Sequence, residues 1–322
     1  MIKRFARWFV LLVLIALAVW YAARHGEMLR SVRQIAWPYL LVVAGLNLTN
    51  KLLMALQFRE LCRAFGAELT FREWFGLSVC NTMYNYLAPG HAGAAVRALY
   101  LKKAHRLPLA HFGAILAGGN VLALIAAGLI GLAAGALLKL SGAPGATRIL
   151  ALLAVLLAMT LAGALALALG TRLVGLVPSE TLRGHLERAS EGLRLYPRHP
   201  GMMARVVGLR ALQVGIGGLA LFVCGRAVGL AVNPPQATAL QALGAFSVLL
   251  PITPAGLGVR EGIVTGGASL LGLPVELALL TALVRRAVHT GVTLVLGLSF
   301  SYSLLDGLKL ARDGEQEAAT DG

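Results

Sequence analysis

Charged side chains are scarce in this sequence. They make up 13% of its 322 residues, whereas soluble domains usually carry roughly 25%. Apolar residues make up 58% of the chain, and the mean hydropathy is +0.76. So few charges cannot cover the surface of a water-soluble protein, and the composition therefore predicts an integral membrane protein.

Recognisable catalytic arrangements are missing as well. The chain has only 14 acidic residues, and no pair of carboxylates stands out in its apolar segments. It shows no nucleophile elbow, no phosphate-binding loop and no cluster with metal-ligand spacing. An enzyme would have to rely on Glu60, Glu73, Glu261 or His91, and nothing in the sequence groups them. We therefore expect no catalytic residue, no bound metal and no cofactor.

The three cysteines give no disulfide framework. Cys62, Cys80 and Cys224 are widely spaced and lie in apolar surroundings, where small buried side chains are their usual role. Lysine and arginine outnumber the acids and give a formal net charge of +15. Because no aromatic-rich basic surface accompanies this charge, we expect anionic membrane lipids as partners and no nucleic acid. The sequence leaves the oligomeric state open.

Long apolar runs dominate the chain. Six of them reach the roughly 20 residues that a bilayer crossing needs: 5–22, 38–58, 109–138, 148–170, 206–229 and 276–303. We expect the first to be a retained span and not a signal peptide, because it ends in Trp20-Tyr21 and not in a small-residue cleavage site. Two more apolar segments, near 72–103 and 238–272, are broken at their centres. The predicted fold class is therefore an all-α polytopic integral membrane helical bundle with six full spans and two re-entrant helical hairpins; eight full spans is the alternative.

Positive charge suggests an orientation for this bundle. With both hairpins re-entrant, 18 lysines and arginines fall on one side and 5 on the other. Since positive charge marks the cytoplasmic side, we expect a bacterial-type cytoplasmic (inner) membrane protein with both termini in the cytoplasm. The hairpins then enter from opposite sides, in an inverted-repeat arrangement. We expect one transmembrane domain over 1–310 and a short disordered polar tail over 311–322. Near 179–196 we expect an amphipathic helix on the cytoplasmic surface or, alternatively, a simple loop helix packed on the bundle.

The two broken segments carry similar motifs. The second reads PAGLGVR over 254–260, and its proline and glycines, together with Pro251 just before it, cannot continue a helix. We expect Pro254, Gly256 and Gly258 to shape a loop from which the restarting helix directs free N–H groups at an anion. Arg260 would donate to phosphate, and Glu261 would orient it, pair a cation or accept a proton. Alternatively, the two residues only satisfy each other or other buried groups.

The first break reads PGHAGAAVR over 89–97. By the same logic, Pro89 and Gly90 form the turn, His91 lies at its tip, and Asn85 and Arg97 flank it as ligands. The alternative roles are structural: an asparagine that hydrogen-bonds between helices and a histidine that bonds to the backbone of the turn.

Other polar residues also fall deep in apolar segments, where charge is costly. We expect Lys51 to be a second anion ligand or else part of a structural ion pair. Of Arg285 and Arg286, we expect one, assigned to Arg285, to face the cavity while the other snorkels or pairs. Asn120 and Gln213 are expected to be structural.

The two motifs resemble those of a known family. The run 250–262, LPITPAGLGVREG, is similar to the signature of the lysylphosphatidylglycerol synthase transmembrane-region family, a flippase-like family. The run 89–99, PGHAGAAVRAL, resembles that family's earlier Pro-Gly…Gly…Arg motif. The resemblance implies a polytopic bundle with re-entrant helices, similar to the membrane domain of the multiple peptide resistance factor, which moves aminoacylated phosphatidylglycerol between leaflets.

This chain also departs from the family. About 12 polar residues follow its last span, where those relatives carry an aminoacyltransferase domain, so we expect the synthase part to be lacking. The segment 112–124 lacks the charged residues that members often carry there, which leaves the substrate open.

Together these features predict a lipid translocase. It would move an anionic or phosphate-bearing lipid, or a lipid-linked glycan, with the headgroup held by Arg97, Arg260 and the helix N-termini. The alternatives are an accessory membrane subunit that presents lipid to a glycosyl- or aminoacyl-transferase partner, and a polyprenyl or glycolipid transferase.

Overall fold

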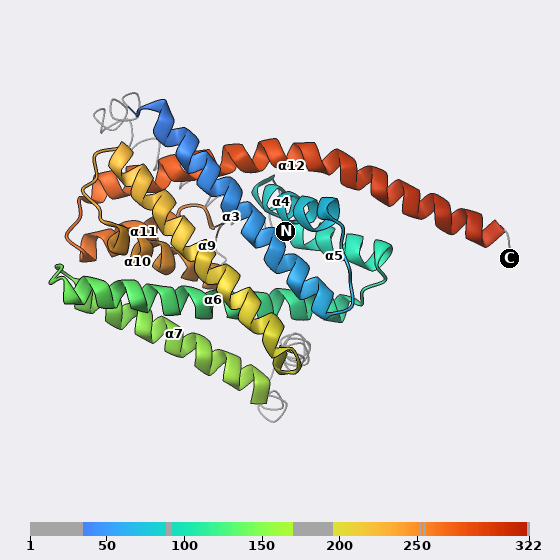
Figure 1. Ribbon diagram of the computed structural model, residues 1–322, viewed down its shortest axis with the longest axis horizontal. Coiled ribbons are helices and arrows are strands. Elements are labelled where there is room, and N and C mark those ends of the chain that lie inside the picture. The colour runs from blue at the N-terminus through green and yellow to red at the C-terminus, as the bar shows by residue number, and fades with distance from the viewer. Residues whose placement is uncertain (1–34, 88–91, 170–195, 251–252, 254–255, 321–322) are drawn as a thin grey trace, which may run out of the picture.

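The fold comes from a computed structural model that describes residues 35–87, 92–169, 196–250, 253 and 256–320. Every regular element within these residues is helical, which confirms the all-α class (Figure 1). In chain order the elements are α3 (Trp37–Ala64), α4 (Phe71–Leu87), α5 (Ala92–Ala104), α6 (Leu109–Leu140), α7 (Ala146–Leu169), η2 (Tyr196–Arg198), α9 (Pro200–Ala227), α10 (Pro234–Ala245), η3 (Phe246–Leu249), α11 (Val259–Leu270) and α12 (Val275–Thr320).

Five of the described helices are long and apolar enough to cross a membrane: α3, α6, α7, α9 and the part of α12 up to Ser301. They match five of the six predicted spans, and the sixth, 5–22, lies outside the described residues. Large apolar side chains on these helices remain exposed, such as Leu140 at 85% and Met159 at 64%. Apolar faces of this kind are expected where a helix contacts lipid.

The two broken segments form helical hairpins. α4 packs against α5, and α10 packs against α11. These helices have 17, 13, 12 and 12 residues, fewer than the roughly 20 that a full crossing needs. The breaks coincide with the two sequence motifs. The structure therefore agrees with two re-entrant hairpins and not with eight full spans.

Two buried apolar clusters lie at opposite ends of the long helices. One joins the end of α3, the start of α4, the end of α5 and the starts of α6 and α9. The other joins the ends of α6 and α9 to α10, α11 and the start of α12. The α4–α5 hairpin therefore enters the bundle from one end and the α10–α11 hairpin from the other, at right and left in Figure 1. This is the inverted arrangement predicted from the sequence.

Side-chain caps set where two of the hairpin helices begin. At α4, the Thr70 N–H and hydroxyl both donate to the Glu73 carboxylate, at 2.8 and 2.9 Å. At α10, Asn233 and Gln236 form a reciprocal capping box, in which each backbone N–H donates to the other's side chain at 2.9 Å. These bonds satisfy N–H groups that a helix start leaves without an intrahelical partner.

Glycines shape both hairpins. A Cβ atom at Gly93 would collide with the backbone carbonyl of Asn81, so this glycine lets α5 lie close against α4. Before α11, Gly256 and Gly258 have φ angles of +66° and +79°, a left-handed conformation that favours glycine. The Pro/Gly composition of the two motifs thus follows from the tight backbone geometry of each hairpin.

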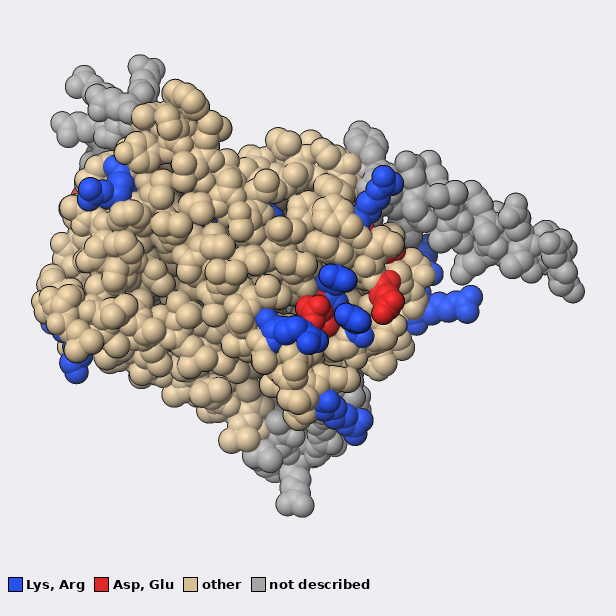
Figure 2. All heavy atoms as spheres, viewed as in Figure 1, with Lys and Arg blue, Asp and Glu red and all other residues tan. Residues whose placement is uncertain are grey.

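Charged side chains on the outer surface gather toward the two ends, and much of the face shown in Figure 2 is uncharged between them. The end where α4 begins and α5 finishes holds most of the exposed basic residues in the described chain: Arg59, Arg63, Arg72, Lys102, Lys103, Arg106, Arg198 and Arg205. The opposite end holds Lys139, Arg148 and Arg226. The positively charged end is the one that the sequence assigns to the cytoplasm, an assignment that stays a prediction.

The C-terminal helix is longer than its apolar span. α12 continues to Thr320, so residues 311–320 are helical where we expected a disordered tail. Alanine and glutamate are strong helix formers, and they extend the helix beyond its apolar part. The amphipathic helix expected near 179–196 lies outside the described residues except for Tyr196, whose hydroxyl donates to the Ala114 carbonyl at 3.2 Å.

Candidate functional site

A cavity of about 870 Å³ lies where the two hairpins meet the long helices. Residues of both hairpins line it, together with residues of α3, α6, α9 and α12. Lys51, in the lining, lies at the middle of α3, about 20 Å from either helix end at 1.5 Å per residue. The cavity therefore reaches the middle of a helix that is long and apolar enough to cross a membrane.

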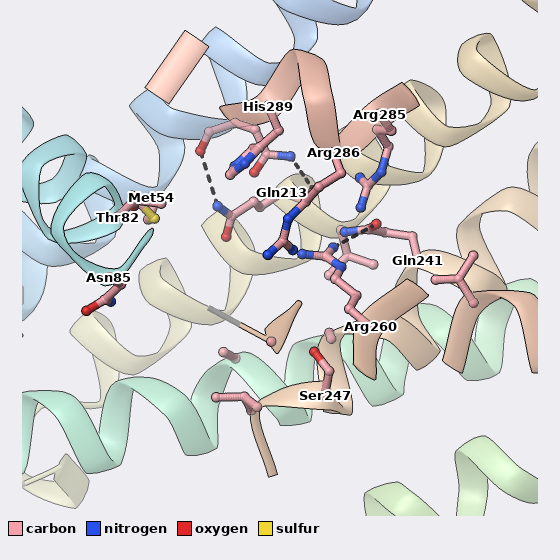
Figure 3. Close-up of a pocket in the computed structure, with 18 of the residues that line it drawn as sticks. Met54, Thr82, Asn85, Gln213, Gln241, Ser247, Arg260, Arg285, Arg286 and His289 are labelled. Atoms are coloured by element: carbon pink, nitrogen blue, oxygen red, sulfur yellow. Dashed lines mark hydrogen bonds between the residues drawn. The ribbon is translucent and has the colours of Figure 1, made fainter. Parts of the chain in front are cut away.

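Five basic side chains line this cavity: Lys51 of α3, Arg210 of α9, Arg260 of α11, and Arg285 and Arg286 of α12. Lys51 is only 3% exposed, and Arg260 and Arg286 lie close enough to repel it. The side chains of Arg260, Arg285 and Arg286 converge on one region of the cavity (Figure 3). Because like charges repel strongly in a medium of low dielectric constant, an anion would stabilise this cluster.

Two of the arginines, Arg210 and Arg260, hydrogen-bond to neutral side chains, but each keeps one N–H donor without a partner in the described chain. Arg210 Nη1 donates to the Gln213 side chain at 2.6 Å, and Arg260 Nη2 donates to that of Gln241 at 3.1 Å. The Nε atoms of Arg210 and Arg260 are buried and make no hydrogen bond within the described chain. A buried donor without a partner costs about 1–3 kcal/mol, which a bound acceptor would offset.

Glu261 is the one carboxylate among the described residues that line the cavity. One of its oxygens accepts the Gly258 N–H at 2.8 Å, and the other lies 3.4 Å from Arg286 Nη1. Glu261 thus holds the N–H of Gly258, the residue just before α11, and the expectation that the first turn of α11 presents free N–H groups to an anion stays a prediction. This arrangement is a short-range form of the favourable pairing between an acidic group and a helix N-terminus.

Asn85 makes a similar contact in the first hairpin, although it lies on the helix before the break. Its side-chain oxygen accepts the Gly93 N–H, near the start of α5, at 3.0 Å. Both hairpins thus use a side chain that lines the cavity to cap the helix following the break. One N–H near the start of each of these helices is therefore already satisfied by the protein itself.

Carboxamides join α3 to α9 at the cavity wall. The Gln213 side chain donates to the backbone carbonyl of Asn50 at 3.1 Å, and the Asn50 side chain donates to the backbone carbonyl of Gln213 at 3.3 Å. Gln57 donates to the Gln213 side chain at 3.2 Å. These bonds fit the structural role expected of Gln213, which also lines the cavity, as does Asn120.

A tyrosine and a histidine link the first hairpin to α12. The Tyr86 hydroxyl lies 3.0 Å from His289 Nδ1. The guanidinium carbon of Arg286 lies 5.1 Å from the centre of the Tyr86 ring, a distance at which cation and ring attract. Arg286 therefore contacts both Tyr86 of the first hairpin and Glu261 of the second.

The structure brings half of the predicted ligands together. The cavity lining contains Lys51, Asn85, Gly256, Arg260, Glu261 and Arg285. Gly258 turns the backbone nearby but is not part of the lining. Pro89, Gly90, His91 and Pro254 lie outside the described residues, so their predicted roles stay predictions.

Arg97 lies elsewhere. It is 8% exposed, its guanidinium carbon lies 3.9 Å from the centre of the Phe58 ring, and its Nη2 donates to the Leu77 carbonyl at 3.5 Å. α5 runs away from the break, and by Arg97 it packs in the cluster at the α4–α5 end. Arg97 and Arg260 end similar sequence motifs, but of the two only Arg260 lines the cavity.

Several lining residues were not predicted as ligands. Arg286 lines the cavity together with Arg285, where we expected only one of the two to do so. Arg210, Gln241 and His289 also line it. A charge in an apolar segment was the available signal for Arg210, whereas neutral Gln241 and His289 carry no comparable signal in sequence.

The sequence that forms this site matches a known protein family. A protein-family model described as "Lysylphosphatidylglycerol synthase TM region" matches residues 8–297. The chain belongs to this lysylphosphatidylglycerol synthase transmembrane family. The match contains both hairpins and every residue of the cavity lining. A search of curated proteins finds no match.

Family membership confirms the resemblance seen in the two motifs. It identifies a multi-pass membrane protein linked to lipid handling. In this family member, the described residues contain no group of three or more His, Cys, Asp or Glu side chains suited to a metal. What the cavity offers is concentrated positive charge and hydrogen-bond donors.

Proposed function

We propose that this protein is a lipid translocase that moves an anionic or phosphate-bearing lipid, or a lipid-linked glycan, between the two leaflets. The headgroup would pass through the cavity between the hairpins while the acyl chains stay in the bilayer. One observation carries the proposal: among the described residues, five basic side chains and a single carboxylate line one cavity beside the middle of the apolar helix α3.

Charge balance supports an anionic headgroup. A charge at the bilayer centre costs at least about 2.5 kcal/mol even on the most lenient scale, so the four arginines, which stay ionised, need compensation. Glu261 offsets one charge, through Arg286. A phosphate would supply acceptors for the open Nε donors of Arg210 and Arg260, and arginine pairs with phosphate through two parallel hydrogen bonds.

Apolar residues at the cavity edge support a lipid and not a soluble anion. Val248 and Leu250, at the second break, line the cavity and remain 48% and 47% exposed. Leu249 between them is 51% exposed. Exposed apolar side chains beside a charged cavity suit a molecule that has a polar headgroup and hydrocarbon tails.

The opposed hairpins support movement and not only binding. Structural repeats of opposite orientation that meet at a central site are a recurring architecture of transporters with alternating access. Here both hairpins contribute to one lining and enter from opposite ends. In this proposal the headgroup enters from the cytoplasmic side or leaves toward it, at the end rich in exposed lysine and arginine.

The test is lipid movement in reconstituted vesicles. Fluorescent phosphatidylglycerol is placed in both leaflets, and a membrane-impermeant quencher reports how fast the inner-leaflet pool becomes accessible. Wild-type protein should expose this pool. Arg260→Gln and Arg285→Gln should each slow the movement by about tenfold or more, because a hydrogen bond to a charged group contributes about 1.5–3 kcal/mol.

Arg148→Gln is the matched control, because Arg148 is an exposed arginine outside the cavity. It should behave as wild type. Vesicles with wild-type protein that behave as empty vesicles would contradict the proposal, and so would an Arg285→Gln variant with the wild-type rate.

A further inference from the structure

We infer that Arg286 links the tips of both hairpins to α12 and that its two contacts act as the two gates of the cavity. The inference rests on the proposed function and deepens it, because it names the contacts that decide from which side a headgroup reaches the cavity. The contact with Glu261 closes the end from which the second hairpin enters. The contact with Tyr86, which His289 supports, closes the end from which the first hairpin enters.

α12 is the element that the two hairpins share. In the described chain, α12 packs on α4 of the first hairpin and on α11 of the second, whereas neither α4 nor α5 packs extensively on α10 or α11. Arg286 and His289 both extend from α12 toward the cavity (Figure 3). His289 lies about 4.5 Å farther along the helix, toward the end from which the α4–α5 hairpin enters. The order of the contacts along α12 thus matches the entry of the hairpins.

The residues that contact α12 are fixed to the tips of their own hairpins. Glu261 accepts the Gly258 N–H with its second oxygen at 2.8 Å, so its carboxylate moves together with the start of α11. Next to Tyr86, the Asn85 side chain accepts the Gly93 N–H at 3.0 Å and joins the two arms of the first hairpin. Movement of either tip therefore breaks a contact with α12 and leaves the bonds within the hairpin intact.

Both contacts with Arg286 are weak enough to be exchanged. The 3.4 Å between Arg286 Nη1 and Glu261 is longer than the roughly 2.7–2.9 Å of a strong charge-assisted hydrogen bond. The 5.1 Å from the guanidinium carbon to the centre of the Tyr86 ring approaches the limit of about 6 Å for such attraction. A phosphate that binds Arg286 takes the donor from Glu261 and draws the guanidinium off the ring. A headgroup thus weakens the gates that it has to pass.

The bases of the hairpins are fixed more firmly than the tips. Phe75, near the start of α4, is 5% exposed and packs edge-on against Phe300 of α12, with 5.2 Å between the ring centres. At the other base, Ala268 of α11 and the adjoining Leu271 are fully buried in the apolar cluster at that end. Each hairpin is therefore expected to bend away from α12 at its tip.

Thiol labelling measures from which side the cavity can be reached. Ala123→Cys places a reporter in the cavity lining on α6, outside both hairpins. The three native cysteines are buried, and buried thiols react slowly. Membranes that contain the full-length protein are prepared as right-side-out and as inverted vesicles. A membrane-impermeant maleimide is added to each, and mass spectrometry of the protein gives the labelling rate.

Two further cysteines identify the end that faces the reagent. Lys103→Cys lies at the end from which the α4–α5 hairpin enters, and Lys139→Cys lies at the opposite end; both lysines are exposed. The sidedness of a gate is therefore read against these two markers and does not depend on the orientation expected from the sequence.

Each gate variant should open one side. Glu261→Gln should raise the labelling rate of the reporter about tenfold or more from the side on which Lys139→Cys reacts, and Tyr86→Leu from the side on which Lys103→Cys reacts. A tenfold change corresponds to about 1.4 kcal/mol between closed and open forms. Tyr86→Phe keeps the ring and loses the hydroxyl that contacts His289, so its effect should be smaller than that of Tyr86→Leu.

Variants of Arg286 test the link itself. Arg286→Gln removes both contacts and should raise labelling from both sides. Arg286→Lys keeps a cation opposite Glu261 and the Tyr86 ring, so its rates should lie closer to those of the parent protein. Glu276→Gln and Tyr39→Leu change exposed residues of α12 and α3, and both should label like the parent.

A loss of structure alone would expose the reporter from both sides. Rates that rise equally from both sides in Glu261→Gln and in Tyr86→Leu would therefore overturn the inference, and so would parent rates in Arg286→Gln. The proposed function survives either result if wild-type protein still moves phosphatidylglycerol. If wild-type protein moves no lipid, the proposed function fails on its own test, whatever the labelling shows.

Discussion

Arg286 and Glu261 form a buried ion pair that ties α12 to the start of α11. Their closest atoms are 3.4 Å apart, and the two side chains are 13% and 8% exposed. The same carboxylate accepts the Gly258 N–H. Glu261 thus fixes the second break and neutralises one charge of the basic cluster at the same time.

Replacing Glu261 should therefore lower stability and increase the attraction of the cavity for anions. Glu261→Gln leaves a buried arginine without its counter-charge, a change that typically costs about 3–5 kcal/mol. Thermal unfolding in detergent should begin at a lower temperature than in wild type, and added phosphate should restore more stability to the variant than to wild type. Glu276→Gln, at an exposed glutamate of α12, is the control. Equal melting temperatures for both variants would contradict the role of Glu261.

Arg97 should matter for the packing of the first hairpin and not for anion binding. Its guanidinium group lies over the Phe58 ring and donates to Leu77, outside the cavity lining. Arg97→Met should lower the melting temperature, while the affinity for inorganic phosphate stays within about twofold of wild type. Arg285→Gln, measured beside it, should lose phosphate affinity. Loss of phosphate affinity in a folded Arg97→Met protein would contradict this prediction and would indicate that Arg97 helps to bind the anion.

Gly93 should not tolerate a side chain. Because a Cβ atom there would overlap the Asn81 carbonyl, Gly93→Ala must push α5 away from α4, at a cost of about 1–3 kcal/mol. Chemical unfolding should show this loss. At Gly113 on α6, an added Cβ has nothing within 4 Å, so Gly113→Ala should be neutral or stabilising by up to about 1 kcal/mol. The idea of close hairpin packing fails if the two alanine variants are equally stable.

Glu73 should make stability depend on acidity at the base of the first hairpin. Burial alone would raise the pKa of Glu73, but the hydrogen bonds from the Thr70 backbone and from the side chains of His105, Thr70 and Tyr100 outweigh burial and hold its pKa below the ordinary 4.5. A carboxyl with a lowered folded-state pKa contributes stability that is complete above the unfolded-state pKa and is lost as pH falls through the folded-state value.

Wild-type protein should therefore lose stability as the pH falls below about 4.5, and Glu73→Gln should remove part of this dependence. Thermal unfolding measured between neutral and acidic pH gives the comparison. Glu68→Gln is the control, because the Glu68 side chain is 87% exposed and should leave the wild-type pH profile intact. An unchanged profile in the Glu73→Gln variant would contradict this assignment.

Much of the fold follows from the sequence because membrane burial leaves strong signals. Apolar length predicted the five described spans, and the Pro/Gly motifs predicted both hairpins. Buried charge is costly, and for that reason Lys51, Arg260 and Arg285 were recognisable as candidates for a shared cavity. Their convergence from α3, α11 and α12 agrees with that reasoning.

Other parts of the site depend on helix rotation, which the sequence does not encode locally. Arg97 and Arg260 follow similar motifs, yet α5 turns Arg97 onto Phe58 while α11 turns Arg260 into the cavity. Gln241 and His289 are neutral and lie on helices where either face could be buried. The capping of α11 by Glu261 was also hidden, because the same residue could equally have faced a ligand.

The most direct test of the account is an experimental structure of the protein in lipid nanodiscs that contain phosphatidylglycerol. The account predicts density for a phosphate within about 4 Å of the Arg260 and Arg285 guanidinium groups, as expected for charge-assisted hydrogen bonds, with lipid tails leaving past Val248 and Leu250. Lipid density confined to the outer faces of the bundle, with the basic cluster open to bulk water, would contradict it.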